Sequence, residues 1–248
     1  MMRFDIITIF PKIFNSYFNE SIVRRAQKSG KIKINIIDLR KFSTDKHKKI
    51  DDKSYGGGPG MVLKIEPLTK ALRSILRISN FQFPIFKQIS KSKLQKLKTK
   101  IILFSPAGKQ FNSKMAAEWA RKYDQIIMIA GHYEGVDERI QKIIGNWKLK
   151  IENLSVGPYV LTGGELPAMI VVDAISRHIS GVLGKNESLE EERLGIGVPV
   201  YTRPEVFSAE GGSASGGKWR NKKYIVPKVL LSGNHKKIEE WRKKHQKR

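Results

Sequence analysis

Two stretches decide the expected fold: IILFSPAG at residues 101–108 and IIMIAGHYEG at residues 126–135. Each opens with a run of apolar residues short enough for a buried strand, and each run ends at a turn that contains glycine. The segment between them carries apolar residues at helical spacing, and Asn112 or Ser113 can cap the start of that helix. A strand, a helix and a second strand in this order predict an α/β fold with a mainly parallel sheet.

The N-terminal region continues this alternation of strands and helices. Residues 6–10 are apolar enough for a strand, and Pro11 suits the first turn of a helix that Gly30 ends. Residues 31–36 alternate between polar residues and isoleucine, which predicts a strand with one solvated face.

The loops that leave the carboxyl ends of parallel strands are the usual ligand sites of such sheets. Here they are expected at residues 105–108, 131–135 and 155–164. The third loop, with the start of the helix that follows it (SVGPYVLTGGELP, residues 155–167), is the strongest signal, because its three glycines and two prolines demand an unusual backbone path that suits a buried ligand contact. A helix should follow it to about residue 179, and Glu165 suits the positive N-terminus of that helix.

The second loop, GHYEG, places an aromatic ring and a carboxylate between two glycines. Such a loop could hold an adenosine, with the carboxylate on the ribose hydroxyls and backbone groups on the base. Two simpler interpretations stay open: Asp137 and Glu138 suit the start of the following helix, and His132 alone is more typical of a surface or packing residue. A further glycine cluster, YGGGPGM at residues 55–61, lacks the ending of a phosphate-binding P-loop, so a tight turn and a binding loop fit it equally well.

Charge indicates the class of partner. The 248 residues contain 47 Lys and Arg against 23 Asp and Glu, a net charge of +24, which favours nucleic acid first and an anionic membrane surface second. A hydrophobic content of 40% supports a folded core and excludes general disorder. The absence of cysteine excludes disulfides and thiol catalysis, and the five histidines show no paired metal-ligand spacing. No apolar run reaches bilayer length, so the sequence predicts a soluble, cytoplasmic protein.

Composition also suggests the domain organisation. We expect a first domain at residues 1–183, an acidic linker at 184–200 and a small, very basic domain at 201–248. Residues 80–100, which are rich in lysine, and residues 208–223, which are rich in glycine and serine, are interpreted as insertions. A solvated surface loop is the simplest structure for both.

Several longer motifs occur in a fixed order along the chain. They are IFP at residues 9–11, DDKSYGGGPGM at 51–61, GHYEGVDER at 131–139, YVLTGGELPA at 159–168, GVLG at 181–184, YTRPEV at 201–206 and VLLSGNH at 229–235. Taken together they resemble the TrmD family of bacterial tRNA (guanine-N1)-methyltransferases, of the SPOUT superfamily. The resemblance extends over nearly the whole chain, apart from the two insertions.

The resemblance implies a SPOUT-type α/β domain with a deep trefoil knot, followed by a small, mostly helical C-terminal domain. It implies a homodimer whose active site lies at the subunit interface, with S-adenosylmethionine held in the knot. Many members of the family depend on magnesium, so magnesium is admitted as a cofactor. By resemblance, the residues that contact S-adenosylmethionine are Ser105, Pro106, Gly131, Tyr133, Glu134, Gly135, Val156, Gly157, Tyr159, Leu161 and Gly163.

The implied substrate is the guanosine at position 37 of tRNA, next to the anticodon. A carboxylate must remove the N1 proton of this base, and the family has an aspartate eight residues after the position of Gly184, where this chain has Glu192. Glu190 or Glu191 is the alternative base, and a merely solvated acidic linker is the simpler interpretation. The resemblance gives Arg177 the task of stabilising charge on the guanine oxygen.

The basic segments would then bind phosphates of the anticodon arm. Two other hypotheses remain: an RNA-binding relative with weak catalysis, and a knotted methyltransferase that acts on another RNA.

Overall fold

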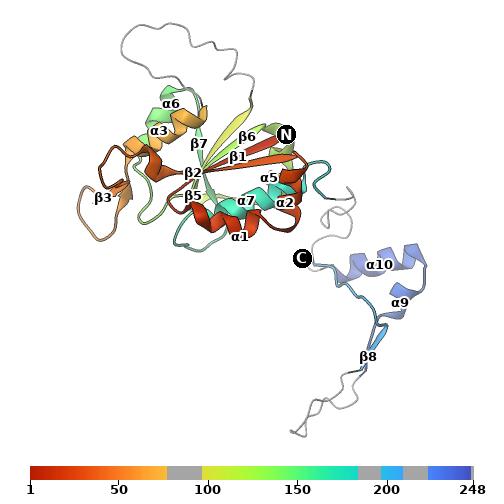
Figure 1. Ribbon diagram of the computed structural model, residues 1–248. Helices are drawn as coiled ribbons and strands as arrows, with labels where there is room; N and C mark the ends of the chain where they lie inside the picture. The colour runs from red at the N-terminus through yellow and green to blue at the C-terminus, as the bar shows by residue number, and fades with distance from the viewer. Residues whose placement is uncertain (77–96, 184–196, 209–222, 247–248) are drawn as a thin grey trace. The chain divides into compact units, whose positions relative to one another are not determined.

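The structure is a computed structural model that describes residues 1–76, 97–183, 197–208 and 223–246. The chain divides into two compact units, Met1–Gly184 and Lys185–Arg248, and each is described by itself (Figure 1). In the described residues, no helix is both long and apolar enough to cross a membrane.

The first unit is built on a parallel sheet of five strands in the order β2-β1-β6-β5-β7. The strands are β1 (Met2–Thr8), β2 (Ile32–Asp38), β5 (Thr99–Gln110), β6 (Gln125–Ile129) and β7 (Ile151–Ser155). Every neighbouring pair runs parallel, which confirms the predicted α/β class. The insertion expected to end at residue 100 ends earlier, because Thr99 and Lys100 already pair with β6.

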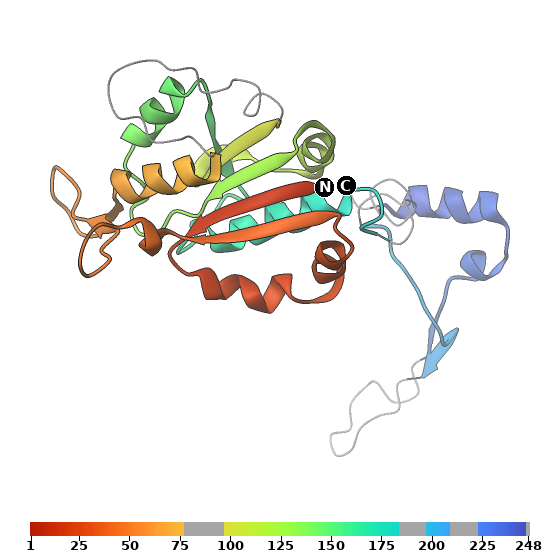
Figure 2. The ribbon, with the colours of Figure 1, turned by 45° about the horizontal axis from the view of Figure 1, so that its top comes forward.

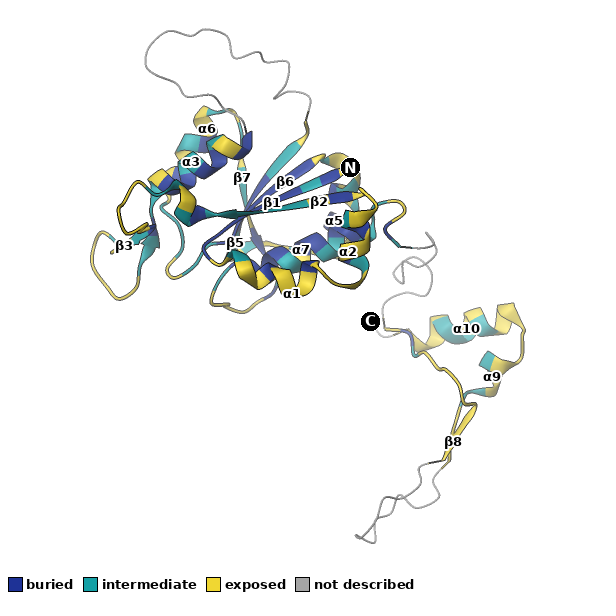
Figure 3. Cartoon of the chain, viewed as in Figure 1, coloured by how far each residue is buried: buried dark blue, intermediate teal, exposed yellow. Residues whose placement is uncertain are grey.

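Helices cover both faces of this sheet, as Figure 2 shows. The first face carries α1 (Asn15–Phe18), α2 (Ser21–Lys28), α5 (Ser113–Lys122) and α7 (Glu165–Arg177), and the second carries α3 (Ile65–Leu76) and α6 (Arg139–Asn146). Side chains of β1 point alternately to the two faces of the sheet. Phe4 packs in the hydrophobic core on the first face, and Ile7 packs in the hydrophobic core on the second. The central strands are therefore largely buried on both sides (Figure 3), and β6 is an almost continuous apolar run.

Three local expectations were wrong or incomplete. The helix expected between Pro11 and Gly30 is three short pieces, a 3₁₀ turn over Pro11–Phe14 followed by α1 and α2. The first strand runs over Met2–Thr8 rather than residues 6–10. The solvated face expected for β2 is only partly solvated: Lys33 is exposed, but Ile37 on the same face packs against the second core. Pattern alone does not reveal that a sheet is covered on both faces.

Other local expectations are confirmed. The Asn112 side chain caps α5 by accepting a hydrogen bond of 2.9 Å from the Met115 N–H. The helix expected after Gly164 is α7, which ends at Arg177.

The second unit contains an antiparallel pair, β8 (Val206–Ser208) and β9 (Lys223–Ile225), followed by α9 (Lys228–Leu231) and α10 (His235–His245). The Asn234 side chain caps α10 through the Lys237 N–H. None of these four elements contains a buried residue. Most of the expected acidic linker and of the expected insertion at 208–223 lies outside the described residues.

Candidate active site

Three segments of the first unit enclose a cavity of about 290 Å³ near the ends of β5, β6 and β7. This volume is at the lower end of small-molecule sites, which span about 300 to 1,000 Å³. The structure brings together here all eleven residues that the resemblance assigns to the methyl donor. They are Ser105, Pro106, Gly131, Tyr133, Glu134, Gly135, Val156, Gly157, Tyr159, Leu161 and Gly163.

The first segment is an irregularity within a strand, and not the simple loop expected at residues 105–108. Phe104 and Lys109 both pair with Leu154 of β7, so the residues between them bulge out of the ladder. A Cβ at Gly108 would lie 2.5 Å from the Leu154 backbone nitrogen. Only glycine therefore lets the two strands approach this closely beside the cavity.

The second segment is a tight turn. Tyr133 has φ +58° and Gly135 has φ +113°, and the Gly135 N–H donates a 3.1 Å hydrogen bond to the His132 carbonyl. Asp137 accepts hydrogen bonds from the backbone and guanidinium of Arg139, which lower the pKa of Asp137. Asp137 is thus engaged at the start of α6, as the helix-start interpretation expected.

The glycine cluster at residues 55–61 supports this turn. It joins β3 (Asp51–Asp52) to β4 (Val62–Leu63). The Glu134 N–H donates to the Met61 carbonyl at 3.0 Å, and the Leu63 N–H donates to the Gly135 carbonyl at 3.0 Å. Gly60 has φ +95°, and a Cβ there would collide with the Glu134 side chain. The cluster is therefore a tight turn that also holds a wall of the cavity, a role that its sequence did not reveal.

The third segment folds back on itself and onto the second. Ser155 Oγ donates to the Gly157 carbonyl at 2.8 Å, and the Tyr159 ring lies where a Cβ of Gly157 would be. The Gly164 N–H donates to the Gly131 carbonyl at 2.8 Å, and a Cβ at Gly164 would lie 2.6 Å from the Cα of Ala130. Glycines therefore allow the two cavity loops to touch.

The start of α7 carries a buried polar cluster beside the cavity. Glu165 is only 4% exposed, and its Oε1 accepts a 2.7 Å hydrogen bond from the Thr8 hydroxyl. Its Oε2 lies 3.9 Å from Nδ1 of His132, a cavity-lining residue. His132 therefore has a specific polar environment that sequence reasoning missed.

The two predicted catalytic residues are placed differently. Arg177 is the last residue of α7, whose first turn lines the cavity at Pro167. Ten residues of helix separate the two, a distance of about 15 Å along the axis. Arg177 therefore does not line the cavity of its own chain. Glu192, with its alternatives Glu190 and Glu191, lies outside the described residues.

Near the same end of α7, Asp173 accepts a 2.6 Å hydrogen bond from the Tyr17 hydroxyl. This bond is the main reason that the pKa of Tyr17 is raised to about 12, and partial burial and the Asp173 charge act in the same direction.

A family model described as tRNA (Guanine-1)-methyltransferase TrmD matches residues 2–248 of the chain. The chain belongs to this family. The match spans both units and extends the motif resemblance to the whole sequence. Membership in the TrmD family implies S-adenosylmethionine as the methyl donor, and the mainly parallel sheet with helices on both faces is consistent with a SPOUT-type fold.

Relatives in the TrmD family have similar lengths. A tRNA (guanine-N(1)-)-methyltransferase of Clostridioides difficile is 44% identical over 245 residues, 98% of this chain and 91% of the relative. Proteins of the same name from Carboxydothermus hydrogenoformans and Mycoplasma mycoides are 42% and 44% identical and cover 98% and 99% of this chain. The match covers 82% and 87% of those two relatives.

Proposed function

We propose that the chain transfers a methyl group from S-adenosylmethionine, held in the 290 Å³ cavity, to N1 of the guanosine at position 37 of tRNA. The observation that carries this proposal is the convergence of eleven residues from three distant segments on one cavity, in a chain of the TrmD family. The reaction is assigned to the cytoplasm, where tRNA is modified.

The residues of the cavity fit this methyl donor. Gly131, Gly135 and Gly157 have no side chains, so a flat adenine can approach the backbone of the cavity wall closely. Val156 and Leu161 supply apolar walls for its faces, and Glu134 and Glu138 are carboxylates of the lining that are available for hydroxyl or ammonium groups. When bound, S-adenosylmethionine supplies an electrophilic methyl group on a sulfonium.

The chain itself has to make the base nucleophilic. Guanine N1 carries a proton at neutral pH, so a carboxylate must accept that proton as the N–C bond forms. We assign this task to Glu192, with Glu190 and Glu191 as alternatives. Arg177 stabilises the negative charge that develops on the guanine oxygen. In the described part of the chain no three His, Asp or Glu side chains gather to hold a metal ion, so no step is assigned to magnesium.

The position of Arg177 supports a homodimer. Since Arg177 lies about 15 Å along α7 from the cavity, a second copy is needed to bring an arginine to each site. The surface of α7 offers an apolar contact: Leu166 and Ile170 are 56% and 43% exposed, and Ile13 and Tyr17 beside them are 44% and 43% exposed. We propose that this surface pairs with itself, and that Arg177 of the partner subunit completes the cavity.

The family resemblance adds a trefoil knot around the second and third cavity segments. The backbone contact between Gly164 and Gly131, and the β-bridge between Gly163 and His132, support the proposal because they hold the two segments against each other. Such a knot would hold the methyl donor in a fixed, bent shape.

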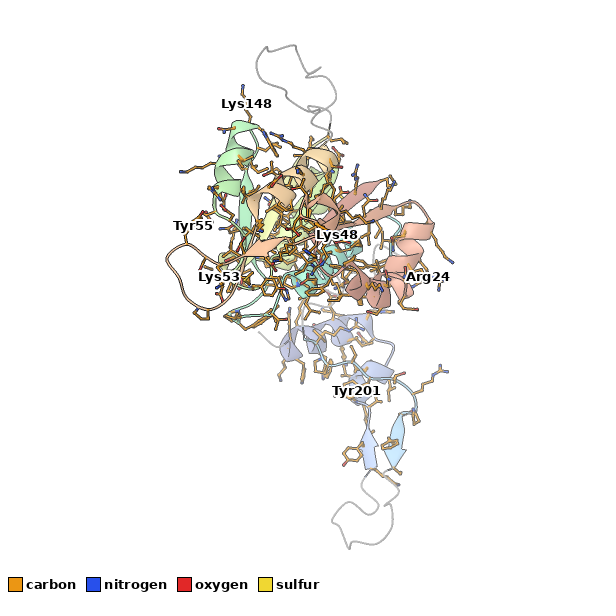
Figure 4. The ribbon with its side chains drawn as sticks, turned by 60° about the vertical axis from the view of Figure 1, so that its left-hand side comes forward. Arg24, Lys48, Lys53, Tyr55, Lys148 and Tyr201 are labelled. Atoms are coloured by element: carbon orange, nitrogen blue, oxygen red, sulfur yellow. The ribbon has the colours of Figure 1, made fainter. Side chains whose placement is uncertain are left out.

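Exposed basic side chains suit the anticodon arm as a partner. Figure 4 shows Arg24, Lys48, Lys53 and Lys148 on the first unit, all exposed. In the second unit, α10 carries Lys and Arg along most of its length. Contacts of these residues with phosphates predict an affinity for tRNA that falls steeply with salt.

The test is transfer from labelled S-adenosylmethionine to two tRNA transcripts, with guanosine or adenosine at position 37. We expect incorporation only into the first. Glu192→Gln and Arg177→Ala should each lower kcat by about 100-fold or more. Glu187→Gln, in the same acidic run, is the matched control and should retain activity. Transfer to both transcripts would contradict position 37, and tRNA binding without transfer by the unaltered chain would favour an RNA-binding relative.

A further inference from the structure

Three polar side chains meet beside the cavity although they are far apart in sequence. Thr8 ends β1, Glu165 begins α7, and His132 belongs to the turn after β6. Glu165 is almost fully buried, so each of its oxygens needs a hydrogen-bond donor.

The direction of one hydrogen bond is fixed by its neighbour. The Phe10 N–H donates to the Thr8 hydroxyl oxygen at 2.9 Å, and the hydroxyl proton is then directed at Glu165 Oε1, 2.7 Å away. Glu165 Oε1 is therefore satisfied as an acceptor. The other oxygen, Oε2, lies 3.9 Å from Nδ1 of His132.

The His132 side of this contact is incomplete. Its Nδ1 is buried and makes no hydrogen bond, and it stands 3.9 Å from Glu165 Oε2, beyond hydrogen-bond length. The Phe10 ring at 5.0 Å and the Tyr133 ring at 4.8 Å both pack edge-on to the imidazole. The two groups are close enough for a movement of about 1 Å to join them.

The gap between His132 Nδ1 and Glu165 Oε2 lies at the wall of the cavity. Gly163 is paired with His132 by a β-bridge, and both residues line the cavity. A Cβ on Gly163 would lie 2.5 Å from His132 Nδ1 and would also collide with Glu165 Oε2. A ligand that presses on either loop therefore changes the His132–Glu165 distance.

We propose that His132 is a cofactor-binding residue and that Glu165 is the positioning residue that sets its tautomer. On filling of the cavity, Nδ1–H donates to Glu165 Oε2, which leaves Nε2 as an acceptor for an N–H donor of the methyl donor, an amine of its adenine or amino-acid part. This inference rests on the proposed function for the identity of the ligand. It assigns a binding role to His132, which its sequence context alone indicated as a surface or packing residue.

The first test reads the tautomer directly. Nitrogen-15 NMR of the full chain with S-adenosylhomocysteine should show His132 protonated at Nδ1 and not at Nε2. In Glu165→Gln, the amide oxygen still accepts from Thr8, but its NH₂ now faces Nδ1 and should force the proton to Nε2. Unchanged ring-nitrogen shifts of His132 in this variant would overturn the inference.

The second test measures affinity for S-adenosylmethionine and S-adenosylhomocysteine by calorimetry. His132→Asn keeps a donor in the place of Nδ1 but removes Nε2, so we expect about tenfold weaker binding with an unchanged unfolding temperature without ligand. His47→Asn, an exposed histidine, is the control and should bind normally. If His132→Asn and Glu165→Gln bind both ligands within twofold of the unaltered chain, the role of His132 is overturned and the proposed function is not affected. Absence of binding by the unaltered chain would overturn it together with the proposed function.

Discussion

Asp5 and Glu165 are both buried carboxylates of the first unit, but their surroundings differ. Asp5 is fully buried and has a complete set of partners: it pairs with Arg3 and accepts 2.8 Å hydrogen bonds from Asn35 and Gln125. Glu165 has one full partner, Thr8, and one incomplete contact with His132. The first cluster ties β2, β1 and β6 together, whereas the second borders a cavity.

The difference separates a structural cluster from a responsive one. Both carboxylate oxygens of Asp5 accept hydrogen bonds, which rigidifies the strands that they join, although Arg3 Nε is buried beside Asp5 Oδ2 without a hydrogen bond of its own. A network with one unmade bond can gain that bond when a ligand moves a loop. Unmade hydrogen bonds, rather than burial, therefore distinguish the carboxylate that we propose to act in binding from the one that joins the strands.

The largest effect is expected from breaking the complete cluster. Asp5→Ala leaves Arg3, Asn35 and Gln125 without their common acceptor, and should lower the free energy of unfolding by about 3 kcal/mol. Urea-induced unfolding measures this loss. The protein that remains folded should bind S-adenosylmethionine normally, and a selective loss of affinity without loss of stability would contradict the distinction drawn between the two carboxylates.

An intermediate effect is expected from a substitution that pushes His132 away from Glu165. Gly163→Ala places a methyl group against His132 Nδ1 and Glu165 Oε2. The resulting overpacking of about 1–3 kcal/mol should appear as about 5-fold to 150-fold weaker binding of S-adenosylmethionine. Calorimetric titration gives the affinity. Gly145→Ala is a matched control, because a Cβ at Gly145 meets nothing within 4 Å. Equal affinities of the two variants would show that the gap has no bearing on the ligand.

The smallest effect concerns a half-buried carboxylate, Asp173, and its bond to Tyr17. Because the pKa of Tyr17 is raised to about 12 from 10.0, the stabilisation that this bond provides is fully present below pH 10 and is lost as the pH rises towards 12. Tyr17→Phe should remove that dependence and change the unfolding temperature only slightly at pH 7. Unfolding temperatures recorded from pH 8 to pH 12 would show it, and identical profiles for both proteins would contradict the assignment.

Much of the first unit could be predicted from the sequence. The apolar runs at 101–104 and 126–130 and the capping Asn112 were sufficient for an α/β sheet and a capped helix. The motifs at 105–106, 131–135 and 156–163 indicated cavity-lining residues, all of which meet in one place. The predictions of strands and of the helix cap succeeded because strand length and capping depend on neighbouring residues, whereas the cavity-lining residues were named from the family resemblance.

Other features required the folded chain. The turn at residues 55–61 is joined to Glu134 by backbone hydrogen bonds that leave no trace in local spacing. The 3.9 Å gap between His132 and Glu165, and the separation of Arg177 from the cavity along α7, likewise follow from packing alone.

The sequence by itself determined the class of fold, the positions of the glycine-containing loops at the strand ends and the basic character of the protein, because each of these follows from local pattern or from composition. The tertiary structure decided which distant groups meet. Thr8, His132 and Glu165 come together only because parallel pairing of β1 with β6, and packing of α7 on one face of the sheet, bring three remote segments to the same end of the sheet.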